Sequence, residues 1–270
     1  MTDLHLILLS VLQGLTEFLP VSSSGHLILF SKLTSFIDQG PEIDVAVHIG
    51  SVMAVIIYFW RDVSLMLKGL WQTHFLPNFK ISGARLAWLI VIGTIPAVIF
   101  GLALKSYGLE HLRNAELIGW TLIGYGILLY IADKYGKTTR TTDNLGIKDA
   151  IIIGCAQCLA LIPGTSRSGI TITASRFLGL QRREAAKFSM LLSVPAIIGA
   201  GCLVAFDLLK SGNIENIHNA LHGIGYSFIA SITAIYIMMS WLKKWSFTPF
   251  VIYRLLLGTY LLGKAYNFLS

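Results

Sequence analysis

Two short stretches decide how this chain folds: Pro20-Val-Ser-Ser-Ser-Gly-His26 and Pro163-Gly-Thr-Ser-Arg-Ser-Gly169. Each places Pro, a Ser-rich run and Gly inside a longer apolar stretch, residues 4–30 and 149–180. Non-helical backbone at membrane depth is tolerated only inside protein or beside water. Matching breaks in two halves of a membrane protein point to a binding site. We therefore predict two re-entrant helical hairpins, each entering and leaving on one face.

The rest of the chain has the composition of a polytopic membrane protein. Of the 270 residues, 54% are hydrophobic and 13% are charged, whereas a soluble domain carries about 25% charged residues. A spanning helix needs about 20 mostly apolar residues. We predict one all-α membrane domain, residues 1–270, with two re-entrant hairpins and about six transmembrane helices. The predicted spans, separated by short polar loops, are 45–60, 86–104, 115–132, 188–209, 225–242 and 249–266.

Basic residues in the loops predict the orientation. In this topology thirteen Lys and Arg residues fall on one side, in loops 61–85, 133–148, 180–187 and 243–248, against five on the other. The positive-inside rule makes the thirteen cytoplasmic, so the net charge of +7 needs no nucleic acid as partner. Three spans in each half invert the halves, about 1–132 and 149–270. The first hairpin then enters from outside and the second from the cytoplasm, and their tips meet near the midplane.

The first hairpin contains one acidic residue, Glu17. Ionisable groups inside a membrane are costly, so each is a candidate functional group. Gln13 lies four residues earlier, on the same helical face, and an amide and a carboxylate would then share one cavity. The alternative is an interfacial Glu near a helix end.

The turn after Glu17 can bind an anion. Successive backbone N–H groups at Ser22, Ser23 and Ser24 can form an anion-binding nest, and a helix that starts near His26 adds a favourable field for phosphate. A plain Ser-rich turn that caps a helix is the equally weighted alternative.

The second turn carries Arg167, which needs an anionic partner at a hairpin tip. It can hold a phosphate in bidentate fashion or form a structural pair with Glu17. Thr165, Ser166 and Ser168 can donate to the same oxygens. Outside the turns, we expect Arg176 and Arg254 to snorkel towards the interface. We expect His48, alone on an apolar helix, to be a packing residue.

These residues resemble a known family, the bacterial undecaprenyl pyrophosphate phosphatases of the bacitracin-resistance type. The resemblance covers essentially the whole chain and rests on Gln13-x-x-x-Glu17, FLPVSSSGH at 18–26 and PGTSRSG at 163–169. It implies removal of the terminal phosphate from a C55 polyprenyl diphosphate. The monophosphate then returns to cell-wall (peptidoglycan) synthesis, and the activity confers bacitracin resistance. It also implies a multi-pass protein of the cytoplasmic (inner) membrane, with an outward-facing site that uses magnesium or calcium.

We assign roles to the candidate residues as a hypothesis. Arg167 neutralises the phosphoryl oxygens, Ser23 is the preferred nucleophile, and His26 is its base or itself the nucleophile. Glu17 orients His26 or binds the cation, although Gln13 leaves only one carboxylate for a metal. A phosphoserine, a phosphohistidine and direct attack by water all fit. The diphosphate is positioned by Gln13, Ser22, Ser24, Thr165, Ser166 and Ser168.

Two other function classes compete with a phosphatase. Inverted repeats with broken hairpins are typical of secondary transporters, so the same residues could bind the lipid head group during flipping without cleaving it. A purely structural scaffold leaves Arg167 at a hairpin tip unexplained. The Ser cluster beside His26 favours cleavage. The sequence leaves the oligomeric state open, with a homodimer among the candidates.

Overall fold

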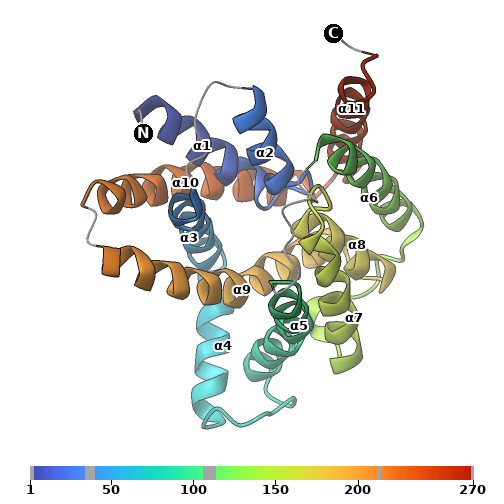
Figure 1. Ribbon diagram of the computed structural model, residues 1–270. Coiled ribbons are helices and arrows are strands. Elements are labelled where there is room, and N and C mark those ends of the chain that lie inside the picture. The colour runs from blue at the N-terminus through green and yellow to red at the C-terminus, as the bar shows by residue number, and fades with distance from the viewer. Residues whose placement is uncertain (1–2, 34–39, 106–113, 212–213, 269–270) are drawn as a thin grey trace.

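The computed structural model describes residues 3–33, 40–105, 114–211 and 214–268. Within these ranges the regular structure is helical, apart from one isolated bridge between Arg140 and Leu180, which confirms the all-α prediction. Figure 1 shows both described ends of the chain on the same side of the helical bundle. The helices are α1 (Asp3–Thr16), α2 (Ser23–Leu33), α3 (Gly40–Tyr58), α4 (Trp60–Gln72), α5 (Ser82–Lys105), α6 (Ala115–Tyr135), α7 (Ile147–Cys158), α8 (Arg167–Phe177), α9 (Arg182–Ser211), α10 (Ile214–Trp241) and α11 (Thr248–Ala265).

Both predicted hairpins form helix–turn–helix units, α1 with α2 and α7 with α8. The first helix of each hairpin packs on a helix from the other half of the chain, α1 on α10 and α7 on α5. Gly14 and Gly154 permit this, because a Cβ there would collide with the carbonyl oxygens of Ser227 and Gly93. This exchange of partners is the packing expected of two related halves. The re-entrant path and the repeat boundaries stay predictions.

Some of the predicted spans coincide with helices long and apolar enough to cross a membrane. These are α5 over Ser82–Leu104, α6 over Ala115–Tyr135 and α10 over Ile217–Trp241. The predicted span 45–60 lies in α3, which qualifies only together with α4, beyond an 83° bend. α9 and α11 cover the remaining two without qualifying over the described residues. The protein is therefore a multi-pass membrane protein whose count of six spans stays a prediction.

Helix α4 corrects the expected loop at 61–85. Its sequence is too polar for the helix to be a span on its own. The helix carries charged residues together with apolar residues that remain exposed, Leu65 at 60% and Trp71 at 74%. It packs on α5 where Gly69 and Gly83 let the two backbones approach. An amphipathic helix that turns away from the preceding helix in this way suits a membrane–water boundary.

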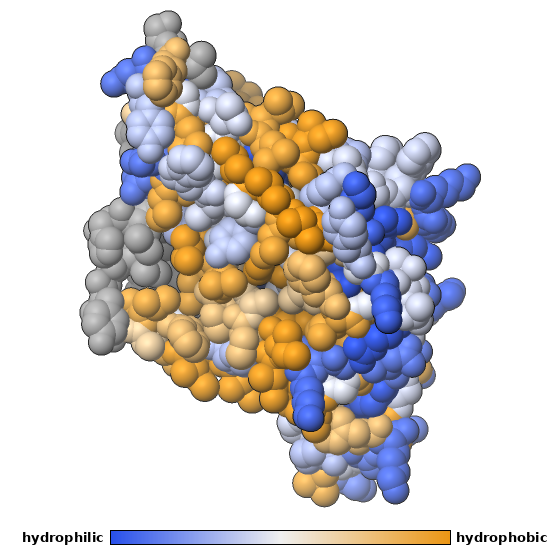
Figure 2. Space-filling model, turned by 90° about the vertical axis from the view of Figure 1, so that its right-hand side faces the viewer, coloured by the Kyte–Doolittle hydropathy of each residue, from blue (hydrophilic) through white to orange (hydrophobic). Residues whose placement is uncertain are grey.

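The surface agrees with a lipid environment. Figure 2 shows a broad hydrophobic face with a hydrophilic edge. On a soluble protein so large an apolar surface would be an aggregation hazard. Exposed large apolar residues on α5 alone include Val91, Ile95, Val98, Ile99, Phe100 and Leu102.

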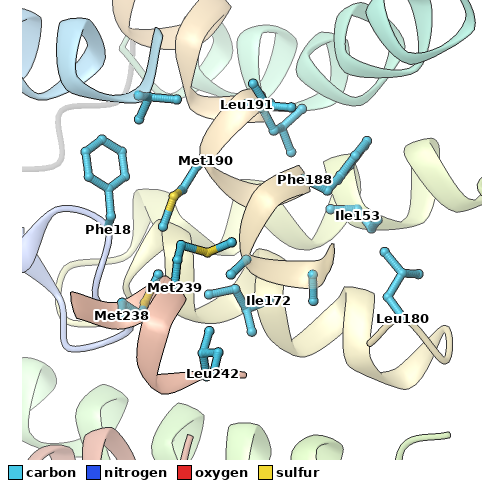
Figure 3. Packing of buried hydrophobic residues seen from close by; sticks show 14 of the residues in the cluster. Phe18, Ile153, Ile172, Leu180, Phe188, Met190, Leu191, Met238, Met239 and Leu242 are labelled. Atoms are coloured by element: carbon cyan, nitrogen blue, oxygen red, sulfur yellow. The ribbon is translucent and has the colours of Figure 1, made fainter. Parts of the chain in front are cut away.

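A buried cluster fixes the tip of the first hairpin. Phe18 is fully buried and shares this cluster with Met190 of α9 and Met238 of α10 (Figure 3). Helices in membranes are held by close packing, because lipid tails are as apolar as Leu. Phe18 therefore anchors the backbone next to Glu17.

The two arginines expected to snorkel are both fully buried, so that prediction is wrong. Arg176 pairs with Asp133, Nε to Oδ1 at 3.2 Å, and donates to the carbonyls of Lys137 and Gly136. Arg254 donates to backbone carbonyls of three segments. Satisfied hydrogen bonds inside the protein compensate for the lost water, which local sequence does not reveal.

Candidate active site

Glu17 is the centre of the site. It follows the last residue of α1 and is 6% exposed. Its Oε2 accepts from Gln13 Nε2 at 2.7 Å and from Ser23 Oγ at 2.8 Å. Its Oε1 accepts from Arg167 Nη2 at 2.7 Å. Both hairpins therefore contribute donors to one buried carboxylate, and the predicted Gln13–Glu17 face and Glu17–Arg167 pair are both present.

The two turns share one backbone shape. Ser22 has φ 76° and Ser166 has φ 71°, a left-handed conformation that is uncommon outside glycine. In each turn the serine Oγ accepts from the backbone N–H three residues on, Gly25 at 3.3 Å and Gly169 at 3.1 Å. These bonds cap the helices that follow. Left-handed residues held in this way cluster at functional sites.

This shape puts Ser23 and Arg167 in equivalent places, each directly after a left-handed serine. Each is also the first residue of its helix, α2 or α8. The unpaired N–H groups and the dipole at a helix N-terminus favour an anion. The site therefore combines two helix N-termini, a guanidinium, a hydroxyl and one carboxylate.

The hydroxyls of the other predicted residues of the second turn bond within that turn or to the tip of the first hairpin, apart from that of Thr165. Ser168 donates to the carbonyl of Leu19 at 3.0 Å, which ties the two tips together. Ser166 lies 3.2 Å from Ser168, Oγ to Oγ, in addition to its capping bond. Thr165 is fully buried, and its Oγ1 has no hydrogen-bond partner among the described residues. Ser22 is fully buried, and the side chain of Ser24 lies outside the described part of the chain.

His26 lies in the first turn of α2, three residues after Ser23. Its Nδ1 is 2.7 Å from the carbonyl of Ser22, and its Nε2 is 2.5 Å from the hydroxyl of Tyr253. A carbonyl only accepts, so Nδ1 carries the hydrogen, and in the neutral ring Nε2 accepts from Tyr253. We had expected Glu17 to orient His26, but both ring nitrogens of His26 have other partners. Glu17 orients Ser23 instead.

His48 joins the site, so its assignment to packing is wrong. Its Nε2 lies 3.4 Å from Glu17 Oε2, and its Nδ1 donates to the carbonyl of Asp44 at 2.6 Å. Sequence reasoning also missed Tyr253. Both residues come from helices remote from the two turns, and no local pattern marks them.

Two side chains of the site, Glu17 and Gln13, carry oxygens of the kind that bind a divalent cation. No group of three or more His, Cys, Asp or Glu residues that could hold a metal occurs among the described residues. However, Gln13 Oε1 lies buried beside the Glu17 carboxylate, and no described residue forms a hydrogen bond with it. Magnesium is commonly held by one or two carboxylates with the remaining ligands from substrate phosphate and water.

Comparisons with known proteins identify the family of the chain. The family model described as bacitracin resistance protein BacA matches residues 6–260. An undecaprenyl-diphosphatase of Roseobacter denitrificans is 48% identical over 99% of this chain and 100% of its own length. Undecaprenyl-diphosphatases of Jannaschia sp. and Ruegeria pomeroyi are 47% and 46% identical, over 97% and 99% of this chain and 98% and 100% of their own lengths. This chain belongs to the bacitracin resistance protein BacA family.

Proposed function

We propose that the protein is an integral membrane phosphatase that hydrolyses undecaprenyl diphosphate to the monophosphate and inorganic phosphate. This recycles the lipid carrier of cell-wall synthesis and confers bacitracin resistance. The observation that carries the proposal is the buried carboxylate of Glu17, which accepts hydrogen bonds from Ser23 of one turn and Arg167 of the other.

Arg167 supplies the charge that phosphoryl transfer needs. An arginine beside the phosphoryl group can contribute about 10³–10⁵ in rate. Here it lies 17% exposed at the start of α8, where it can exchange part of its bond to Glu17 for phosphoryl oxygens. The N-termini of α2 and α8 stabilise the same negative charge.

Ser23 is the proposed nucleophile and Glu17 its base. The Ser23 proton passes to Glu17 Oε2, and Oγ attacks the terminal phosphorus. The bond from that phosphorus to the bridging oxygen breaks, and undecaprenyl phosphate leaves. Water then releases inorganic phosphate from the serine. Attack by His26 or directly by water is the alternative, and Nε2 of His26 must first give up its bond to Tyr253.

We also propose a magnesium or calcium ion held by Glu17 and the free oxygen of Gln13. When bound it would neutralise charge on the diphosphate. The site opens to the outer, periplasmic side of the cytoplasmic membrane, since the basic loops are assigned to the cytoplasm.

The direct test is phosphate release from undecaprenyl diphosphate by the purified protein in detergent with magnesium, beside Arg167→Ala. We expect release by the parent and a loss of about 10³-fold or more in the variant. Chelation of divalent cations should abolish the release, and magnesium or calcium should restore it. A folded parent that releases no phosphate with either ion would overturn the proposal and leave lipid transport as the leading function.

A further inference from the structure

Arg254 of α11 lies between the two turns and makes no contact that the proposed chemistry uses. It is fully buried. Nη1 donates to the carbonyls of Pro20 at 3.3 Å and Thr165 at 3.0 Å. Pro20 belongs to the first turn and Thr165 to the second. One guanidinium group therefore holds both turns.

The remaining donors anchor the guanidinium. Nε donates to the carbonyl of Leu122 at 3.1 Å, and Nη2 donates to that of Thr121 at 3.3 Å. Nη2 also reaches Gly164 at 3.2 Å and Thr165 at 3.0 Å. A guanidinium has five N–H donors in a rigid fork, so every one of them is used. A Lys, with three donors on a flexible stem, cannot reproduce this set.

The hydrogen bonds that the structure gives the Arg254 guanidinium go to carbonyl oxygens rather than to a carboxylate. No ion pair of Arg254 occurs within the described ranges, whereas the equally buried Arg176 pairs with Asp133. Removing a charge from water without a counter-ion is expensive. The proposed function puts the diphosphate at the two turns, and its negative charge would compensate the charge of Arg254 there.

We propose that Arg254 is a positioning residue for the phosphatase reaction: it sets the spacing of the two turns and places an uncompensated positive charge behind the diphosphate site. The inference rests on the proposed function. Arg254 does not touch the reacting atoms. It acts through the Pro20 and Thr165 carbonyls, and therefore through the positions of Ser23 and Arg167.

The test compares Arg254→Lys with Arg176→Lys, a matched control at a second fully buried arginine bonded to carbonyls. Both variants lose the planar guanidinium with its five donors and keep the positive charge. A displacement of about 1 Å at an active site can cost 10²-fold in rate. We therefore expect kcat per folded molecule of Arg254→Lys to fall about 10- to 100-fold, with KM changed much less. Arg176→Lys should melt at a lower temperature and keep its kcat per folded molecule.

A second variant covers the case in which Arg254→Lys does not fold. A Cβ at Gly169 would lie 2.9 Å from Nη1 of Arg254 and 3.1 Å from Cβ of Ser166, so Gly169→Ala should push the guanidinium and the second turn apart and lower kcat. In Gly126→Ala the new Cβ lies 3.4 Å from the Arg254 Cβ, an ordinary contact that should leave kcat unchanged. Parental kcat in folded Arg254→Lys, or in Gly169→Ala, would overturn the inference while the parent's own phosphate release still supports the proposed function. An equal loss of kcat per folded molecule in Arg176→Lys would also overturn it, since the effect would then not be specific to the arginine that holds the two turns.

Discussion

The turn after α1 and the turn after α7 hold the same backbone shape and differ in what they present. In both, a left-handed serine caps a helix through a glycine N–H. The next residue is Ser23 in one turn and Arg167 in the other, and both donate to Glu17. One half of the chain supplies the carboxylate and the hydroxyl, and the other supplies the guanidinium. The same backbone shape thus presents two complementary sets of groups to one site.

The helices before the two turns, α1 and α7, also differ in the hydrogen bonds of their glutamines. Gln13 donates to Glu17, four residues on. Gln157 occupies the corresponding place in α7, but the residue four positions on is Leu161, and both amide atoms of Gln157 are buried without a hydrogen-bond partner. The glutamine is therefore bonded to a carboxylate in the first hairpin, and over the described residues the second hairpin has no counterpart of this bond. Comparing the two hairpins separates residues that serve the proposed chemistry from residues that only stand at the corresponding position of the other hairpin.

Within the first turn, the largest effect is expected at Ser23, which supplies the hydroxyl. Ser23→Ala removes the proton donor to Glu17 and the proposed nucleophile. We expect kcat to fall at least about 10²-fold, the scale of a lost proton-transfer partner. The measurement is phosphate release, with acid quenching and mass spectrometry of the parent to detect phosphoserine.

Ser51→Ala is the control for this variant. Ser51 is fully buried and bonds to Ser227, in α3 and α10, outside the two turns. It should lose stability and keep its kcat per folded molecule. Parental activity in Ser23→Ala, with no phosphoserine, would assign the attack to His26 or to water.

A smaller effect is expected from the paired glutamines. Gln13→Leu removes a bond to a charged group, worth about 1.5–3 kcal/mol, and should lower kcat by about 10-fold or more. Gln157→Leu removes a buried amide whose lost hydration costs about 1–3 kcal/mol. It should leave kcat unchanged and raise the melting temperature. Both are checked by phosphate release and thermal unfolding, and an equal loss of activity in the two variants would contradict the asymmetry of the hairpins.

The sequence predicted the features that local pattern controls. Pro and Gly breaks in apolar stretches marked both hairpins, and the spacing of Gln13 and Glu17 placed them on one helical face. The pairing of Arg167 with Glu17 was one of two alternatives, because an intramembrane charge needs a partner.

Features that depend on remote helices could not be predicted. Tyr253 reaches His26 from α11, and His48 reaches Glu17 from α3. Whether Arg254 snorkels or is buried depends on carbonyls from three separate segments, none of which is near it in sequence. The bend before α4 follows from tertiary packing rather than from a strong helix-breaking residue, since Phe59 stands at the junction.

The central claim is that the two turns act as one site through Glu17, and a double-mutant cycle tests it directly. Glu17→Gln, Arg167→Lys and the double variant are compared with the parent by kcat for phosphate release. Residues that act as a unit show strongly non-additive losses. We predict that each single variant loses about 10²-fold or more and that the double variant is no worse than the poorer single one. A double variant whose loss equals the product of the two single losses would show that the carboxylate and the guanidinium act independently, and would contradict the account.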